Sequence, residues 1–150
     1  MSLFRLAPCA FGIALLAGCP TGGGDLADLT FDPPVDERGN ATLDLGDVEV
    51  GTNPPPNATI VVTNNTDAEL TVGVDCDDFN GTPFSGSCPA DGLIIPPVGS
   101  EDPTGAANNF GAVGANLLVG PNDVGEHAAS VFFDYDDRVY VFHLLANVVQ

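Results

Sequence analysis

The stretch LDLGDVEVGTNPPPNATIVVTNNTDAELTV, residues 43–72, decides the fold. Apolar and polar residues alternate almost perfectly over residues 43–50, which predicts a strand with one buried face. Glycine and prolines at 51–56 end that strand, and the β-branched run at 58–63 predicts a second one. A third strand is expected at 68–74, so this stretch alone indicates three consecutive strands separated by turns.

The rest of the chain continues this pattern of short apolar runs separated by turn residues. Strands are expected at 92–95, at 112–119 and, most strongly, at 127–135 and 139–149. About seven short strands without helical periodicity indicate an antiparallel β-sandwich, with an open barrel as the alternative. Residues 97–111 are rich in Gly, Asn and Pro and predict a long loop, a feature that is usually functional or mobile.

The two strongest strands are separated by the acidic pair 136–137 and are expected to form a hairpin. A two-residue loop would set the register so that His127 opposes residue 146 and His143 opposes residue 130. Because side chains alternate between faces, the two histidines of the chain are then expected on opposite sides of the sheet. This arrangement argues against a shared metal or catalytic role and favours structural or surface positions.

Residues 43–72 resemble the start of bacterial choice-of-anchor D and Hydin-type immunoglobulin-like domains. Those domains open with an L-x-F-G-x-V-x-V-G strand and continue with a T-V-T-V-x-N-T-G-x-x-x-L-x-V pair. The matching residues are Leu43, Leu45, Gly46, Val48, Val50, Gly51, Ile60, Val62, Asn64, Asn65, Thr66, Leu70 and Val72, and later echoes are Phe84, Cys88, Leu93, Pro121, Gly125 and Ala129-Ser130-Val131. Leu45 departs from the usual aromatic residue. The resemblance implies an immunoglobulin-like sandwich of a mostly non-catalytic family.

The N-terminus has the features of a secretory signal peptide. One basic residue, Arg5, precedes an apolar run of about 13 residues, whereas a membrane-spanning helix needs roughly 20. A buried core helix is the alternative, but Pro8 and Gly12 would weaken its interior. Residues 1–18 are therefore expected to be a leader that is removed.

The motif Leu16-Ala17-Gly18-Cys19 resembles the lipobox of bacterial lipoproteins. The resemblance implies cleavage before Cys19, lipid on that cysteine, and an extracytoplasmic place on the cell membrane or outer membrane. An ordinary cleavage site with an incidental cysteine is the alternative. Several acyl chains would anchor the protein stably, since one chain alone binds marginally. A flexible Gly-rich, acidic tether is expected at 19–40, followed by one β-sandwich domain at 41–150.

The charge balance narrows the choice of partner. The chain has 21 acidic and three basic residues, and loss of Arg5 with the leader would change its formal net charge from −18 to −19. Nucleic-acid binding depends on Lys and Arg contacts to phosphate and is not expected; neither is a polybasic contact with anionic lipid. A solvated acidic surface, suited to salty surroundings, is favoured over divalent-cation binding.

Cys76 and Cys88 are the cysteines that remain once Cys9 leaves with the leader and Cys19 carries lipid. Two cysteines in a secreted chain predict one disulfide. The loop of about 13 residues that it closes would contribute on the order of 3 kcal/mol to stability. A zinc site is not expected, because the spacing is too wide and no second cysteine pair exists.

Two acidic clusters stand at the ends of predicted strands. They consist of Asp75, Asp77, Asp78, Asp134, Asp136 and Asp137. If those strand ends converged, the carboxylates could bind calcium, which takes about six to eight oxygen ligands. Neither cluster matches the D-x-[DN]-x-[DN]-G calcium loop, and acidic residues also favour turns for local reasons. A calcium-dependent binding domain is therefore the alternative function, with calcium as its cofactor.

The sequence favours a non-catalytic interaction or structural module of the cell envelope over an enzyme. No serine stands in a G-x-S-x-G elbow, and neither a phosphate loop nor a dinucleotide fingerprint occurs. A hydrolase that uses two paired carboxylates is the least supported hypothesis, because no sequence feature singles out two of the acidic residues as such a pair. The expected contacts are the membrane, through lipid on Cys19, and an envelope protein or polysaccharide bound by loops such as 97–111.

Overall fold

A computed structural model describes residues 28–150. The predicted leader, Cys19 and the tether up to residue 27 lie outside the described residues. The described chain contains β1 (Leu29–Asp32), β2 (Asn40–Glu49), β3 (Asn57–Asn64), β4 (Leu70–Asp75), the 3-10 helix η1 (Asp77–Phe79), β5 (Phe84–Gly86), β6 (Leu93–Ile95), β7 (Phe110–Leu117), β8 (Gly125–Tyr135) and β9 (Arg138–Val149). Within this part of the chain, no helix has the length and hydropathy needed to cross a bilayer.

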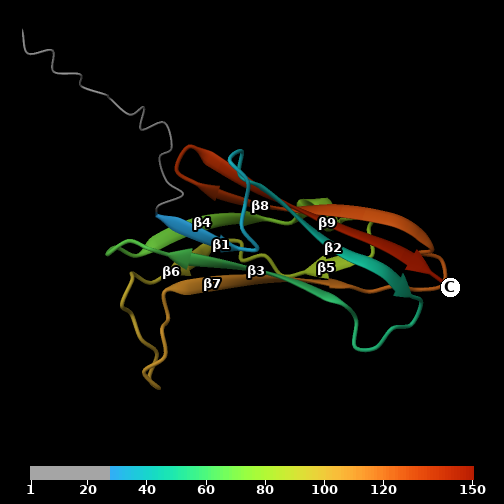
Figure 1. Ribbon diagram of the computed structural model, residues 1–150, viewed down its shortest axis with the longest axis horizontal. Coiled ribbons are helices and arrows are strands. Elements are labelled where there is room, and N and C mark those ends of the chain that lie inside the picture. Colours follow the sequence, from blue (N-terminus) through green and yellow to red (C-terminus); the bar gives the residue numbers. More distant parts are fainter. Residues whose placement is uncertain (1–27) are drawn as a thin grey trace, which may run out of the picture.

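The strands form two sheets packed face to face (Figure 1). One sheet has the strand order β1-β3-β7-β5 and is antiparallel throughout. The other has the order β2-β9-β8-β4-β6, in which β2 runs parallel to β9 and the remaining neighbours are antiparallel. The predicted immunoglobulin-like β-sandwich is therefore confirmed, and the parallel pair makes its larger sheet a mixed one.

β1 corrects the predicted boundary between tether and domain. The sequence predicts irregular structure up to residue 40, yet β1 pairs with β3 over its whole length, from Leu29 to Asp32. Leu29 and Phe31 expose 0% and 4% of their surface because they face the opposite sheet. These two apolar residues occupy alternate positions, as expected for a strand with one buried face. The folded domain thus includes residue 29 rather than starting at residue 41.

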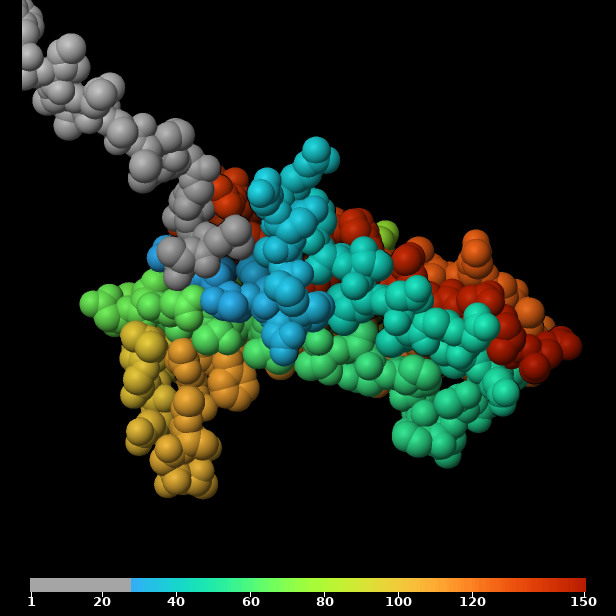
Figure 2. Space-filling model, viewed as in Figure 1, coloured from blue at the N-terminus to red at the C-terminus, as the bar shows by residue number. Residues whose placement is uncertain are grey.

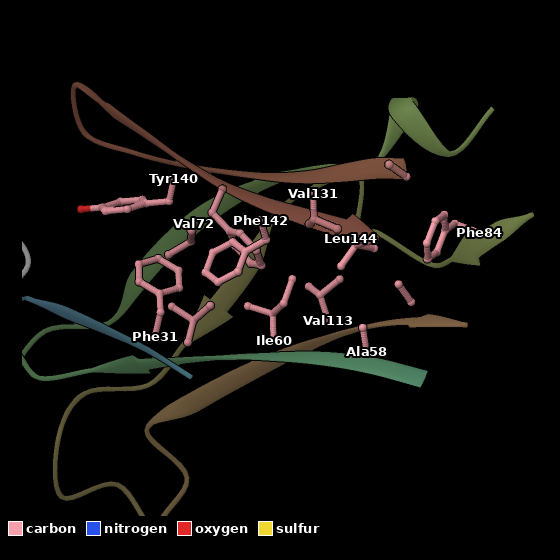
Figure 3. Close-up of a cluster of buried hydrophobic side chains, with 14 of the residues drawn as sticks. Phe31, Ala58, Ile60, Val72, Phe84, Val113, Val131, Tyr140, Phe142 and Leu144 are labelled. Carbon is pink, nitrogen blue, oxygen red and sulfur yellow. The ribbon is translucent and has the colours of Figure 1, made fainter. Parts of the chain in front are cut away.

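The core lies between the sheets, and aromatic rings join them (Figure 3). The ring centroid of Phe31 lies 5.6 Å from that of Phe133, 4.7 Å from Tyr140 and 5.4 Å from Phe142. Phe133 and Phe142 make an edge-to-face contact at 5.3 Å. Aromatic pairs prefer such tilted arrangements, and each ring buries a large apolar area. The strand missing from the sequence-based assignment therefore supplies the central ring of this cluster.

The β8–β9 hairpin has the predicted register. His127 pairs with Ala146, and Ser130 pairs with His143. The histidines accordingly lie on opposite sides of the sheet, as predicted. Asp136 has φ of 53° in the two-residue turn, a left-handed conformation that such turns require and Asp tolerates.

Asn64, at the end of β3, is a fully buried polar residue that fastens several loops together. Its side-chain amide donates hydrogen bonds of 2.7–3.1 Å to the carbonyls of Ala68, Ile95 and Pro96. Its backbone N–H donates to the carbonyl of Asn109, and the Asn109 side chain donates back to the Asn64 carbonyl. Asn64 thereby holds both ends of the projecting loop 97–109, which is gold in Figure 2.

Candidate interaction surface

β9 carries apolar side chains on both of its faces. Tyr140, Phe142 and Leu144 are fully buried, whereas Val139 and Leu145 are 52% and 38% exposed. Since neighbouring side chains in a strand point to opposite sides, the odd-numbered residues of β9 face away from the core. We call this solvent-facing side of the five-stranded sheet the outer face.

Cross-strand pairing assembles an apolar stripe on the outer face. Val141 of β9 pairs with Phe132 of β8, and Leu145 of β9 pairs with Ala128 of β8. The apolar stripe is defined as Phe132, Val139, Val141 and Leu145. Directly opposed side chains have Cβ atoms about 4.5–5.5 Å apart, so Phe132 and Val141 are close neighbours on this face. The polar pair Ser130–His143 interrupts the stripe before Leu145.

Carboxylates lie on both sides of the apolar stripe. The acidic rim is defined as Asp44, Asp47, Asp75, Glu126 and Asp134. On one side, Asp44 pairs with Leu145, and the Asp47 carboxylate accepts a 2.8 Å hydrogen bond from Asn147. On the other side, Asp134 of β8 pairs with Gly73 of β4, two positions from Asp75. The outer face is therefore mainly apolar along its middle, except at Ser130 and His143, and negative along both flanks.

Two shallow hollows indent the outer face. One, of about 540 Å³, is lined by residues that include Asp44, Glu126 and Leu145. The other, of about 380 Å³, is lined by residues that include Phe132, Asp134 and Val139. Each hollow thus brings stripe and rim residues together, a combination suited to an amphipathic partner.

The β2 edge of this sheet is poorly suited to pairing with an added strand. β2 forms one edge, and its register with β9 shifts between Asp44 and Asp47. Gly46, in this bulge, has φ of 67°, and its N–H donates to the Asp44 side chain at 2.8 Å. Bulges and charges on an edge strand hinder the addition of a further strand.

Ser130 and His143 form a pair that sequence motifs did not single out as chemical. The Ser130 hydroxyl lies 3.3 Å from Nδ1 of His143. The pair stands on the open outer face, and neither side chain lines either hollow there. Catalysis by such a pair would need a third group to orient the histidine and an enclosed oxyanion site. The arrangement fits an ordinary cross-strand contact better than a nucleophilic centre.

The predicted calcium ligands serve local structure and do not gather into one site. Asp75 accepts a 2.8 Å hydrogen bond from the Asp77 N–H, and Asp78 lies in η1. Asp136 and Asp137 form the β8–β9 turn, while Asp134 faces outward on β8. Among residues 28–150, no three His, Cys, Asp or Glu side chains are close enough together to hold a metal ion.

Cys76 and Cys88 form the predicted disulfide, with their Cα atoms 6.1 Å apart. The bridge closes the segment that contains η1 and β5, two elements that the sequence pattern did not predict. Phe79 of η1 lies 6.4 Å from Phe84 of β5, so this segment also packs through aromatic contact. The disulfide therefore constrains the segment in which the chain crosses from the five-stranded sheet to the four-stranded sheet.

The predicted binding loop is internally braced. The Asp102 carboxylate accepts hydrogen bonds from the Thr104 hydroxyl at 2.6 Å, the Thr104 N–H at 2.8 Å and the Ala106 N–H at 3.1 Å. These bonds, led by that from the Thr104 side chain, hold the pKa of Asp102 below its ordinary value of 3.8. A bridge between Glu101 and Ala107 closes the projecting loop below its tip. The tip is exposed but lacks the apolar area of the outer face.

No protein-family model and no curated protein matches this chain. Solved structures resemble it at low identity. The ASH/PapD-like domain 7 of human CEP192 is 11% identical with a TM-score of 0.48, and the match covers 100% of this chain and 97% of that one. WR4, a C. elegans MSP family member, is 13% identical with a TM-score of 0.44, covering 80% and 98%. The YadV chaperone is 8% identical with a TM-score of 0.45, covering 82% and 53%. These similarities concern the fold.

The apolar stripe could have been found in the sequence. An antiparallel strand with one solvated face normally alternates, whereas residues 139–145 are apolar at every position except His143. Val139, Val141 and Leu145 have the opposite parity to the buried residues of β9. An unbroken apolar run in a strand that forms a hairpin is therefore the signal of an apolar outer face.

Proposed function

We propose that this chain is a lipid-anchored, extracytoplasmic protein of the cell envelope that acts as a non-catalytic interaction module. The sequence supports the anchor, through the predicted leader and the lipobox-like motif ending at Cys19. The apolar stripe on the outer face, in which Val139 and Leu145 are exposed and Phe132 and Val141 are half-buried, supports the interaction role. Contiguous exposed apolar surface bordered by polar residues is typical of sites that bind other molecules.

The position of β1 sharpens the proposed attachment. If Cys19 carries the lipid, residues 20–28 are all that separate it from the first strand. At about 3.3–3.6 Å per residue, this linker spans roughly 30 Å at most. The domain would then work close to the membrane surface, and its partner would be a protein at or near that surface.

The enzyme and calcium alternatives have less support. Ser130 and His143 lie on an open sheet face rather than in a cleft that could exclude water. The acidic clusters form no group of three or more candidate metal ligands within residues 28–150. The interaction module is therefore the function that the described surface supports best.

The anchor is tested by replacing Cys19 with Ala and following radiolabelled or clickable fatty acid in cells. We expect the variant to lose the acyl label and to leave the membrane fraction, whereas Cys9→Ala, inside the predicted leader, should retain both. A Cys19→Ala protein that still carries label and fractionates with membranes would exclude this anchor.

The interaction role is tested with a photo-crosslinking amino acid introduced at Leu145 of the full-length chain in cells. We expect a discrete crosslinked protein, because Leu145 lies on the outer face and is exposed. Leu118, which is 56% exposed in the segment after β7, provides a matched control position. Equal crosslinking at Leu145 and Leu118, or none at Leu145, would count against a binding role for the outer face.

A further inference from the structure

The distribution of charge on the outer face specifies its partner. The apolar stripe runs along β8 and β9, the central strands of the sheet. The acidic rim borders it from β2 on one side and from β8 and β4 on the other. No residue of the stripe or rim is basic. The two arginines of the described chain, Arg38 and Arg138, line a hollow at the β8–β9 turn, where they meet only the Val139 end of the stripe and neither of its flanks. A partner that covers the stripe must therefore bring positive charge to both flanks.

A second copy of this chain does not satisfy that requirement. Identical faces related by a two-fold axis would place one acidic rim against another. Like charges brought together at an interface cost binding energy, and the formal net charge of −18 adds long-range repulsion. An anionic lipid surface is disfavoured for the same reason.

We infer that the outer face binds a cationic amphipathic helix of a partner protein. This inference rests on the proposed function as an interaction module. A helix laid on a sheet presents one apolar line, and the residues on either side of that line reach sideways. Its apolar line would cover the stripe, and Lys or Arg side chains on both flanks would meet the acidic rim.

The dimensions of the stripe suit a short helix. From Val139 to Leu145, six residues along β9, the stripe extends about 20 Å at roughly 3.4 Å per residue. A helix rises 1.5 Å per residue, so about 13 residues match this length. An added strand is a poorer occupant, because the bulge at Gly46 interrupts the β2 edge where it would pair.

The test measures binding of three labelled peptides to the purified full-length chain by fluorescence anisotropy, in one fixed detergent buffer. The first is an 18-residue Leu/Lys peptide with leucines at helical i, i+3, i+4 and i+7 spacing, which forms a helix of about 27 Å and therefore spans the whole stripe. The second has Glu in place of Lys. The third is a scrambled Leu/Lys peptide of identical composition and charge, in which the apolar line is destroyed.

Two pairs of variants separate the outer face from bulk properties of the chain. Val139→Ser with Leu145→Ser shortens the stripe, and Leu118→Ser with Val124→Ser is its control at other exposed apolar positions. Asp44→Asn with Glu126→Gln neutralises part of the rim. Its control, Asp67→Asn with Glu69→Gln, removes the same charge from the exposed β3–β4 turn.

We expect saturable binding of the amphipathic Leu/Lys peptide alone. The stripe variant should weaken it about tenfold, and the rim variant roughly fivefold, while both controls leave it unchanged. Equal binding of the scrambled peptide, equal loss in the control variants, or no saturable binding would overturn the inference. Concentration-dependent self-association that the stripe variant abolishes would also overturn it, since the outer face would then bind a second copy.

The peptide experiment and the crosslinking experiment fail independently. A discrete crosslink at Leu145 combined with no binding of the amphipathic peptide would keep the proposed interaction role and reject a cationic helix as its partner. No crosslink at Leu145 would reject the interaction role at this face, whatever the peptide does.

Discussion

The ring centroid of Phe31 lies 4.7 Å from that of Tyr140, across the interior between the two sheets. Phe31 belongs to the first described strand, and Tyr140 belongs to the last. The contact lies at one end of the core and joins the N-terminal and C-terminal strands of the domain (Figure 3). β1 is therefore a structural part of the sandwich, and its loss should be felt throughout the domain.

Replacing Phe31 with Ala should lower the free energy of unfolding by about 3–5 kcal/mol, the usual cost of truncating a buried aromatic residue. Urea unfolding followed by circular dichroism measures this change. Thr30→Ser, at the neighbouring exposed position, retains its hydroxyl and should change little. An unchanged free energy of unfolding in the Phe31→Ala variant would mean that residues 29–32 belong to the tether.

Replacing Asn64 with Asp should destabilise the domain by about 3 kcal/mol or more. The substitution keeps the shape but exchanges an amide that donates to three carbonyls for a carboxylate that repels them. Chemical denaturation at neutral pH measures the effect, with Asn108→Asp on the exposed projecting loop as the control. Similar stability of the two variants would contradict the role assigned to the Asn64 side chain.

Removing the disulfide through Cys76→Ser with Cys88→Ser should cost on the order of 3 kcal/mol and lower the melting temperature by roughly 10 °C. The bridge spans a sequence separation of 12 residues, so its effect comes from a short loop. Calorimetry with and without reductant provides the control, because reductant should affect the wild type and leave the double variant unchanged. An unshifted double variant would show that the bridge adds no stability.

The projecting loop should lose its order when Asp102 is protonated. Its pKa lies below 3.8 in the folded chain, so the stabilising effect is present above that value and disappears as the pH falls through the folded-state pKa. Carbon-13 NMR of the carboxyl measures this titration. Thr104→Val removes the leading hydrogen-bond donor and should raise the pKa of Asp102 toward 3.8; an unchanged pKa would rule out that cause.

Monovalent salt should raise the melting temperature at constant pH, because screening weakens repulsion among the 21 acidic residues. Differential scanning fluorimetry in sodium chloride measures the trend. Calcium chloride at matched ionic strength should give the same increase if the carboxylates form no specific site. A stabilisation by calcium well beyond that of sodium would support the calcium alternative.

Sequence patterns predicted the parts of the fold that local chemistry determines. The acidic pair 136–137 between two long apolar runs fixed the register of the β8–β9 hairpin, including the pairing of Ser130 with His143. The segment 43–72 likewise predicted β2, β3 and β4, with bounds close to those observed. In each case, residues that are neighbours in the sequence determine both the turn and the alternation of apolar and polar positions.

Other features depend on contacts between distant segments and left weak local signals. β1 is only four residues long, Leu-Thr-Phe-Asp, with two prolines directly after it, and it is a strand because β3 offers it an open edge. Nothing local reveals that β2 lies parallel to β9. The outer face could have been inferred from the unbroken apolar run of β9, but the acidic rim becomes visible only once β2 and β4 are placed beside the central hairpin.

The pairing of β2 with β9 also sets the order in which the protein can fold during synthesis or export. Asp47 and Asn147, joined by a hydrogen bond, are 100 residues apart in the sequence. A chain that emerges N-terminus first has no partner for β2 until β9 has followed it, and such distant pairings form slowly. The larger sheet therefore closes as a late, concerted event, and any translocation through a narrow channel has to be finished, or nearly so, before the domain exists.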